Sequence, residues 1–343
     1  MTEKKGLASV IVLNWNGKDY IGECLDSLIS QSYKSIEIIV VDNASTDGSA
    51  EMIEAKYSDK VKLIRLDDNK GFAGGNNEGI RNSRGEYILL INSDAVAEYN
   101  WIESLVKSAD RNPESGMFAS KILQYDKRKI IDNTGHLIYA DGLNRGRGRL
   151  EEDRGQYDRE EEVFFASGCA AMYRREAFPF FPPFDEDFFA YGDDTDIGLL
   201  CRIYGWKCTY VPNAVVYHRY SASTSPYSKL KAFYVERNRI WIAIKYFPLS
   251  NLVVSPIYTL LRFIFQAYGA ISGKGAAGRF TEEFSKIDLF IILVKAYASA
   301  FLGLPKMIEK RRMIKKISKV DAKQFRRWLK EYAISATEIA LKE

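Results

Sequence analysis

The first 95 residues alternate between two apolar patterns, and this alternation limits the possible fold more than any other feature of the sequence. Short runs of consecutive apolar residues, typical of buried strands, occur at 8–14, 36–41, 61–66 and 87–91. Between the first two runs, the apolar residues of 20–31 recur at helical spacing. Strands that alternate with helices predict an α/β fold in which a mainly parallel sheet is covered by helices on both faces.

Turn-forming residues indicate where the other helices of this part begin. The segment 45–49 offers a helix start with Asp47 or Ser45 as its cap. A glycine-rich segment at 70–77 is expected to form a turn that leads into a helix ending near Arg84. This turn either faces a ligand or is only a flexible helix entry, and the sequence leaves both interpretations open.

Polar side chains follow three of the four expected strands. In parallel sheets ligands bind beyond the carboxyl ends of the strands, so these residues predict a binding site. No glycine fingerprint of dinucleotide-binding proteins follows the first strand and no P-loop motif occurs, which argues against an oxidoreductase or a P-loop NTPase. The polar residues are Asn14 and Asn16 after the first strand, Asp42 and Asn43 after the second, and Asn92, Ser93 and Asp94 after the fourth.

Few residues in the chain are suited to binding a metal. There are only two histidines, His136 and His218, which excludes a site built from several histidines. Asp94 at a strand end suits a hard divalent cation such as Mg²⁺ or Mn²⁺, although strand-end aspartates also commonly form turns. The segment 211–218 is expected to be a strand ending in His218, which is either a metal ligand or a structural histidine.

The segment 184–197 places six carboxylates among aromatic residues. Asp193, Asp194 and Asp196 lead into an expected helix, where the helix dipole stabilises acidic side chains in the first turn. Capping needs fewer than three aspartates. One of them, close to an acceptor hydroxyl, would serve as a general base.

Seven motifs in this order resemble those of the family 2 glycosyltransferases. The resemblance covers about residues 7–247, and two of its segments, 69–77 and 234–238, resemble the rhamnosyltransferase-like branch. The motifs are Val-Ile-Val-Leu-Asn14-Trp-Asn16, Val-Val-Asp42-Asn-Ala-Ser45, Asn69-Lys-Gly-Phe-Ala-Gly-Gly-Asn-Asn77, Asn92-Ser-Asp94, Ser167-Gly-Cys-Ala-Ala-Met172, Tyr191-Gly-Asp-Asp-Thr-Asp196 and His218.

The resemblance implies a GT-A fold and an inverting, metal-dependent transfer from a dTDP- or UDP-linked sugar. Asp42 would bind the pyrimidine base, Asp94 and His218 would hold Mg²⁺ or Mn²⁺, and Asp194 would be the catalytic base. Two positions depart from the family pattern. Asn92 stands where the metal motif has its first aspartate, and Asp193 replaces the glutamate before the base, which leaves open whether Asp193 or Asp194 takes the proton. The implied donor side is Asn14, Asn16, Asp42, Asn43, Lys70, Gly71, Asn76, Asn92 and Ser93, and the acceptor side is Gly168, Cys169, Tyr191 and Asp196.

A polar, charged stretch at 144–162 separates the two halves of the matching region. It is expected to be a mobile loop that acts either as a solvated linker or as a lid over the donor or acceptor. The three arginines of 144–149 do not indicate a nucleic-acid surface, because acidic residues follow them directly.

The net charge of +4 conceals an uneven distribution along the chain. Residues 229–343 contain 22 Lys and Arg but only 9 Asp and Glu, and they include two long apolar runs at 249–271 and 287–304. The runs are interrupted by Arg262 and Lys295, so helices that lie on an anionic membrane surface are favoured over spanning helices. The segment 306–330 has a basic amphipathic pattern that suits the same surface, a coiled-coil partner or plain solvent.

The expected organisation is therefore a GT-A catalytic domain at 1–228 and a helical, membrane-associating region at 229–343. The catalytic domain would have a donor half at about 1–95 and an acceptor half at about 96–228. Four cysteines without metal spacing and a polar N-terminus suggest a cytoplasmic protein held at the inner face of the plasma membrane. The acceptor would be a glycan or a polyprenyl-linked molecule. A sugar-phosphate nucleotidylyltransferase and a non-catalytic glycan-binding protein are the alternatives, and the oligomeric state is not indicated.

Overall fold

The computed structural model describes residues 3–219 and 228–342. The chain is divided into two units. Unit 1 comprises Met1–His136, Gly146–Arg202 and Trp206–Ser223. Unit 2 comprises Leu137–Arg145, Ile203–Gly205 and Thr224–Glu343.

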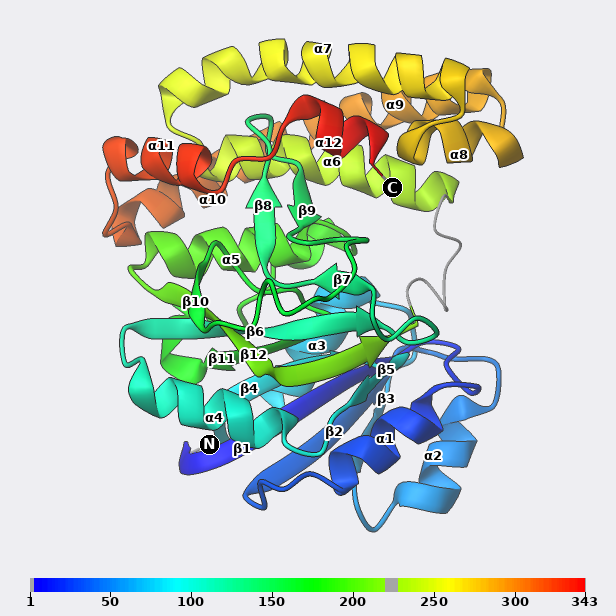
Figure 1. Ribbon diagram of the computed structural model, residues 1–343, viewed down its shortest axis with the longest axis vertical. Helices are drawn as coiled ribbons and strands as arrows, with labels where there is room; N and C mark the ends of the chain where they lie inside the picture. Colours follow the sequence, from blue (N-terminus) through cyan, green and yellow to red (C-terminus); the bar gives the residue numbers. More distant parts are fainter. Residues whose placement is uncertain (1–2, 220–227, 343) are drawn as a thin grey trace. The chain divides into compact units, whose positions relative to one another are not determined.

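Unit 1 is built on a ten-stranded mixed sheet with the strand order β10-β12-β6-β11-β4-β1-β2-β3, to which β5 and β7 add at β12 and β6 (Figure 1). Strands β3, β2, β1 and β4 are mutually parallel, whereas β11 runs antiparallel between β4 and β6. The strands are β1 (Lys4–Asn14), β2 (Ile36–Asp42), β3 (Lys62–Arg65), β4 (Gly85–Asn92), β5 (Ala95–Ala97), β6 (Ser115–Gln124), β7 (Ile131–Asn133), β10 (Glu161–Val163), β11 (Ala170–Arg174) and β12 (Lys207–His218), with β8 (His136–Ile138) and β9 (Asn144–Gly146) in a separate pair.

Helices cover both faces of this sheet because the side chains of its central strand point alternately to each side. Ala8, Val10 and Val12 of β1 pack in one cluster with α1, α2 and α4. Ile11 and Leu13 face α3 on the other side (Figure 1). The predicted α/β architecture is confirmed. The helices are α1 (Ile21–Ile29), α2 (Ser49–Tyr57), α3 (Gly71–Arg81), α4 (Trp101–Arg111) and α5 (Asp193–Ile203), with short 3-10 turns η1 (Arg175–Ala177) and η2 (Glu186–Phe188).

The glycine-rich segment is not the turn that the sequence suggested, because α3 already begins at Gly71 and ends at Arg81. Close packing on β1 explains its glycines. A Cβ at Gly75 would overlap the side chain of Leu13, and one at Gly79 would overlap Ile11. The glycines therefore bring the helix close to the strand, and their helical cost is offset by this contact.

Two other local expectations also need correction. The N-cap of α2 is Gly48, in a left-handed conformation with φ of 80°, whereas Asp47 accepts the Ser49 N–H and does not occupy the cap position itself. The stretch 144–162 is not a plain linker, since it contributes β9 and β10 and several of its arginines form ion pairs. Arg147 pairs with Glu161, for example, at 2.7 Å.

Unit 2 is helical and contains a buried cluster of four charged side chains. Arg262, which is fully buried at the centre of α7, pairs with Asp141 at 2.8 Å and with Glu236 at 2.7 Å, and Arg239 pairs with the same Glu236 at 3.0 Å. Burial would raise the pKa of Glu236, but the two arginines outweigh it and lower the pKa to about 2. The helices are α6 (Lys229–Tyr246), α7 (Leu249–Ser272), α8 (Gly275–Glu283), α9 (Lys286–Leu302), α10 (Leu304–Ile317), α11 (Ala322–Glu331) and α12 (Ala336–Leu341).

The basic segment 306–330 forms two helices, α10 and α11, separated by a bend. Its apolar residues do not make one exposed amphipathic face, because Met307, Ile314, Phe325 and Trp328 are buried. Phe325 packs on Phe247 with their ring centres 5.4 Å apart. These helices are thus part of the core of unit 2.

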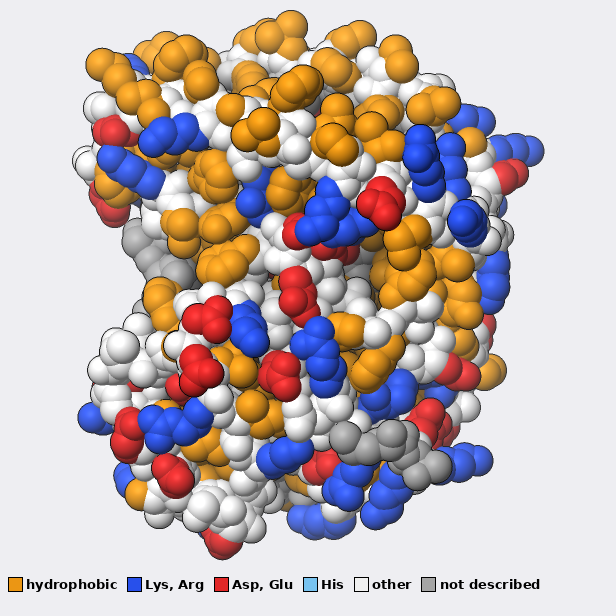
Figure 2. Space-filling model, turned by 180° about the vertical axis from the view of Figure 1, so that it is seen from behind, with side chains coloured by type: hydrophobic (Ala, Val, Ile, Leu, Met, Phe, Trp, Pro, Cys, Tyr) orange, Lys and Arg blue, Asp and Glu red, His pale blue; other side chains and the backbone are white. Residues whose placement is uncertain are grey.

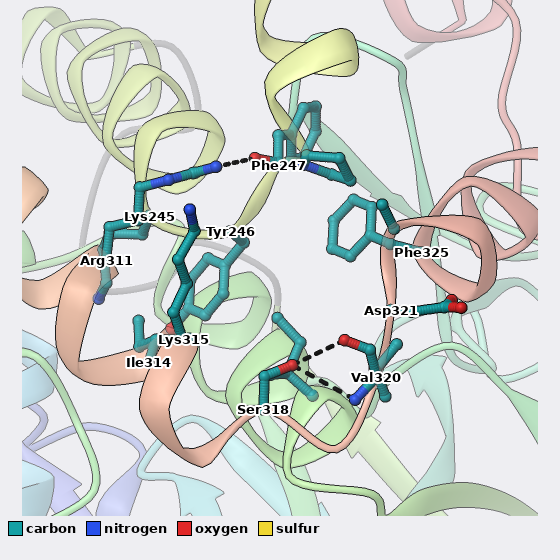
Figure 3. A pocket seen from close by; sticks show the side chains of 13 residues that line it. Lys245, Tyr246, Phe247, Arg311, Ile314, Lys315, Ser318, Val320, Asp321 and Phe325 are labelled. Atoms are coloured by element: carbon teal, nitrogen blue, oxygen red, sulfur yellow. Dashed lines mark hydrogen bonds between the residues drawn. The ribbon is translucent and has the colours of Figure 1, made fainter.

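A pocket opens between α6, α10 and α11, and Lys245, Arg311 and Lys315 are among its lining residues (Figure 3). Arg311 donates hydrogen bonds to the carbonyl oxygens of Ile244 and Phe247, at the end of α6. None of the site residues expected from the sequence lines this pocket. Its arginine therefore has a structural function, which is to satisfy carbonyl groups at a helix end.

Candidate functional site

The residues expected to bind the donor base meet where β1 and β2 end. The Asn14 amide donates hydrogen bonds to Asp42 at 2.8 Å and to Ser49 at 2.8 Å. The other oxygen of Asp42 accepts the Ser45 N–H at 3.1 Å. Because β1 and β2 pair in parallel with Asn14 opposite Asp42, the two side chains emerge at the same edge. The carboxylate is only 2% exposed and rigidly held.

Asn43 connects this edge to the start of α3. Its amide donates to Asn69 at 2.9 Å and to the Gly71 carbonyl at 3.1 Å, and its oxygen accepts the Lys70 N–H at 2.9 Å. Gly71 has a φ of 69°, and a Cβ there would overlap the backbone of Phe189. The expected donor residues Asn43, Lys70 and Gly71 are therefore brought together by one network.

The remaining donor-side residues take different positions. Asn16 has a φ of 50° and its side chain accepts the Thr46 N–H at 2.8 Å. Ser93 borders the turn after β1, because a Cβ at Gly17 would lie 3.2 Å from its hydroxyl oxygen. Asn76 is 2% exposed, and its amide donates a hydrogen bond to the Phe72 carbonyl within α3. Asn92 ends β4, and its N–H donates to the Cys169 carbonyl at 2.9 Å.

Asp94 and His218 lie together, although 124 residues separate them in sequence. Strand β12 pairs with β5, with His218 opposite Ala95, and this pairing places the histidine beside Asp94. His218 Nε2 is 3.4 Å from Asp94 Oδ1, and each side chain is less than a tenth exposed. The predicted strand ending at His218 is confirmed.

These two side chains fit a small divalent cation. A separation of 3.4 Å between an imidazole nitrogen and a carboxylate oxygen suits two neighbouring ligands of one ion with bonds of about 2.1 Å. Among residues 3–219 and 228–342, no group of three or more His, Cys, Asp or Glu side chains is arranged to hold a metal. A cation would therefore depend on the diphosphate and water for its other ligands, as Mg²⁺ commonly does.

The adjacent aspartates Asp193 and Asp194 have different environments. Asp193 is 5% exposed, and one of its oxygens is buried with no hydrogen-bond partner in the described part of the chain. Burial, together with the charge of Asp194, raises the pKa of Asp193 well above its usual range. Asp194 accepts the Gly168 N–H at 2.9 Å and keeps 27% of its side chain exposed. Burial also raises the pKa of Asp194, and the nearby His136 opposes that shift.

One strand pairing connects Asp194 to Asp94 and His218. Strand β11 pairs antiparallel with β4, with Ala170 opposite Ile91, so Gly168 and Cys169 lie at the carboxyl end of β4. Gly168 holds Asp194, and a Cβ on Gly168 would lie 2.6 Å from that carboxylate. The Cys169 thiol lies next to His218. The consecutive residues Gly168 and Cys169 thus contact Asp194 at one end of the site and His218 at the other.

The other acceptor-side residues are less accessible than expected for groups that contact a sugar. Asp196 is 2% exposed within α5. Burial raises the pKa of the Cys169 thiol, so it remains protonated and unreactive near neutral pH. Tyr191 is half-buried and has a φ of 66°, which is uncommon for a residue other than glycine.

Sequence reasoning missed four side chains around this site. Asp132 and Asn133, from β7, contact His218 and His136 at 2.7 Å and 3.2 Å. His136 Nε2 is 3.7 Å from Asp194, its ring stacks on Phe165, and burial lowers its pKa. Arg149 pairs with Asp132 at 2.6 Å. The only signal in the sequence is a short polar run, Asp-Asn-Thr-Gly-His at 132–136, that contains one of the two histidines.

Most of the strands that form this edge of the sheet lie in the part of the chain that matches a known family. The sequence model of glycosyl transferase family 2 matches residues 9–180, half of the chain. The chain belongs to glycosyl transferase family 2. The family match includes Asp42, Asp94 and Gly168 but ends before Asp194 and His218.

Curated members of the family match over a limited segment. Glycosyltransferase GlyG of Streptococcus pneumoniae is 32% identical over 123 residues, which are 35% of this chain and 40% of that protein. TuaG of Bacillus subtilis, named for teichuronic acid biosynthesis, is 33% identical over 96 residues, or 27% of this chain and 38% of that protein. The chain covers less than half the length of these relatives.

Solved structures of glycosyltransferases share the fold over most of the chain. The mannosyltransferase PcManGT of Pyrobaculum calidifontis, in complex with GDP-Man and Mn²⁺, has a TM-score of 0.52 at 16% identity and covers 90% of this chain and 85% of its own. S. aureus TarS 1-349 has a TM-score of 0.53 at 19% identity and covers 95% and 91%. At these identities the likeness establishes the GT-A fold alone.

Proposed function

We propose that this family 2 enzyme is an inverting, metal-dependent glycosyltransferase that moves a sugar from a nucleoside diphosphate to a hydroxyl group of a cell-envelope glycan or lipid-linked acceptor. The observation that supports this most strongly is the β4–β11 pairing. It places Gly168, which holds Asp194, next to Cys169, which lies beside His218. A base for the acceptor and a site for the leaving diphosphate are therefore neighbours.

In the proposed reaction the acceptor oxygen attacks the anomeric carbon from the face opposite the diphosphate. Asp194 takes the hydroxyl proton as the new carbon–oxygen bond forms, and the diphosphate leaves with the electron pair of the broken bond, so the configuration inverts. A cation held by Asp94 and His218 would neutralise the leaving diphosphate. A raised pKa, as found for Asp194, makes its carboxylate a better proton acceptor.

Asp42 is the proposed contact for the nucleotide base, and Asn43, Lys70 and Gly71 are proposed to border the diphosphate. Hydrogen bonds from Asn14 and Ser45 hold the Asp42 carboxylate in one orientation, so that a base is selected by how its hydrogen-bond donors match that fixed carboxylate. The cell-envelope acceptor is suggested by the name of TuaG, which refers to teichuronic acid biosynthesis. Rhamnose from a dTDP-linked donor is one candidate sugar, based on the sequence of the glycine-rich segment.

Two other functions are less well supported. A sugar-phosphate nucleotidylyltransferase would need a basic, glycine-rich loop directly after the first strand, where this chain has Asn14-Trp-Asn-Gly17. A non-catalytic glycan-binding protein has no use for a carboxylate with a raised pKa beside a carboxylate–histidine pair.

A panel of nucleotides tests the proposal directly. With Mn²⁺ or Mg²⁺ present, we expect one of UDP, dTDP and GDP to stabilise the protein against unfolding by about 2.7 kcal/mol at 100 times its Kd. With EDTA the stabilisation by the same nucleotide should be much smaller. The matching sugar nucleotide should then be hydrolysed slowly without acceptor. A nucleoside monophosphate is the control, because it lacks the diphosphate. Absence of stabilisation by every nucleotide with either cation would refute the proposal.

We also propose that unit 2 lies on an anionic membrane surface. The fully buried residues of α7 are Ser255, Thr259, Arg262 and Gly269, whereas most of its large apolar side chains are exposed. Figure 2 shows hydrophobic side chains gathered over the helices of unit 2. More than half exposed are Leu249, Val253, Ile257, Leu260, Ile264, Tyr268 and Ile271 on α7, and Ile287, Phe290, Val294, Phe301 and Leu302 on α9.

The charges of unit 2 favour helices lying flat over a membrane span. By length and composition α7 could cross a membrane, and so could α9 together with α10, which are bent by 57°. Arg262, however, sits at the centre of α7 within its buried ion cluster, and separating such a pair costs about 3–5 kcal/mol. Exposed Lys286 and Lys295 lie on α9 with its apolar residues, exposed Lys306 lies near the start of α10, and all three would attract anionic lipids.

Substitutions on the exposed face of α7 test this placement. We expect Ile257→Glu combined with Ile264→Glu to reduce binding to vesicles containing phosphatidylglycerol by at least about tenfold, since each side chain contributes roughly 1.5–3 kcal/mol when buried. Tyr99→Glu, an exposed position in unit 1, is the matched control and should bind normally. Unchanged binding of the α7 variant in a flotation assay would contradict the proposal.

A further inference from the structure

Four side chains of unit 1 form a continuous line of polar contacts that ends at the proposed metal position. Arg149 Nη1 is 2.6 Å from one oxygen of Asp132, and the other oxygen of Asp132 is 2.7 Å from His218 Nδ1. His218 Nε2 is in turn 3.4 Å from Asp94. Asp132, His218 and Asp94 are each less than a tenth exposed, and Arg149 is 19% exposed. Water therefore has little access to this line.

The contact with Asp132 determines which nitrogen of His218 can bind a cation. A carboxylate accepts hydrogen bonds, so Nδ1 must carry a proton to donate to it. In the neutral ring that leaves the lone pair on Nε2, the nitrogen that faces Asp94. The same contact fixes the rotation of the ring. Carboxylates that hold metal-binding histidines in this way raise metal affinity in many proteins.

The sheet explains why Asp132 reaches His218. Strand β7 pairs with β6 at Ile131 and Asn133, and β6 also pairs with the end of β12, where His218 lies opposite Gln124. Asp132 on β7 and His218 on β12 therefore both lie beside β6. The segment after Arg149 pairs with β7 as well, since Leu150 N–H donates to the Ile131 carbonyl at 2.8 Å. Arg149 is held beside Asp132 by these backbone hydrogen bonds.

We propose that Asp132, supported by Arg149, is a positioning residue that keeps His218 in the tautomer and orientation needed to bind a divalent cation with Asp94. This rests on the proposed function, because it requires a cation at that position. Arg149 offsets the charge of a buried carboxylate that would otherwise be costly to keep ionised. The segment 144–162, expected to be a linker or a lid, thereby acquires a function in the metal site.

The test is Mn²⁺ binding to the full-length chain in the presence of saturating UDP, or of the nucleotide that the panel selects. We expect Asp132→Asn to raise the Kd for Mn²⁺ by about 10–100-fold. Binding of the nucleotide in EDTA should not change. Asp153→Asn is the matched control, because Asp153 also pairs with a buried basic side chain, that of Lys121 at 2.9 Å, whereas the carboxylates that pair with His218 are Asp94 and Asp132. It should leave the Kd for Mn²⁺ as it is.

A second variant and a spectroscopic measurement keep the proposal testable if Asp132→Asn folds poorly. Arg149→Gln should weaken Mn²⁺ binding less than Asp132→Asn does. Nitrogen NMR of the imidazole in the Mg²⁺-bound wild type should show a protonated Nδ1. An Nε2–H tautomer, or equal Mn²⁺ affinity in wild type and both variants, would overturn the proposal. A wild type that binds no Mn²⁺ would instead overturn the metal-dependent function on which it rests.

Discussion

Replacing Asp194 with asparagine is expected to lower the rate of sugar transfer by a factor of about 10²–10⁴ and to leave donor binding nearly intact. The amide cannot accept the acceptor proton, but it can still accept the Gly168 N–H that positions the side chain. Steady-state transfer kinetics and thermal stabilisation by the nucleotide with Mn²⁺ would measure the two effects separately.

The matched control is Asp193→Asn, one position earlier on the same helix. Burial raises the pKa of Asp193 well above its usual range and so favours its neutral form, which the amide resembles. We expect Asp193→Asn to change the rate of sugar transfer by less than about tenfold. The acid limb of the wild-type pH profile should also lie above the ordinary aspartate range, because transfer is lost as falling pH protonates Asp194. A larger loss for Asp193→Asn than for Asp194→Asn would reverse the assignment of the base.

The second large effect is expected from Asp94→Asn. Since Asn92 stands at the first position of the metal motif, Asp94 is the carboxylate of that motif that can bind a cation beside His218. Charge neutralisation by a metal is worth several kcal/mol, which corresponds to a loss of transfer of about 100-fold or more. Stabilisation by the nucleotide should become nearly the same with Mn²⁺ and with EDTA.

The comparison with Asp132→Asn makes this prediction sharper. Losing a residue that binds the metal should weaken metal binding more than losing one that only orients His218. Mn²⁺ affinity should therefore fall further in Asp94→Asn than in Asp132→Asn. Asp153→Asn again serves as the control. If Asp94→Asn retained stabilisation that depends on Mn²⁺, Asp94 would not be a metal ligand and the proposed position of the cation would be wrong.

The strands of the donor half could be predicted from the sequence because their signal is local. Each is a short apolar run that is present in the structure, and β1, β2 and β4 have the expected polar residues at their carboxyl ends. The start of α3 was not predictable in the same way. A run containing Gly71, Gly74 and Gly75 has poor helix propensity, and the packing of Gly75 on Leu13 and of Gly79 on Ile11 offsets this cost only in the folded protein.

The candidate site shows the same division. Asp94, Asp194 and His218 could be selected from motifs in which each residue stands beside recognisable neighbours. Asp132 and Arg149 could not, because their importance comes from the pairing of β7 with β6 and with the backbone after Arg149. The distinction between Asp193 and Asp194 also depended on burial, which neighbouring positions in a sequence do not reveal.

The sequence by itself determined the strands of the donor half, the edge of the sheet where polar residues gather and the family to which the motifs point. These follow from hydrophobic period and residue type, which act over a few neighbouring positions. Only the tertiary structure decided which distant residues meet, because strand order and register bring together side chains more than a hundred positions apart. It also showed that α7 buries Arg262 in an ion cluster while most of its large apolar residues are exposed.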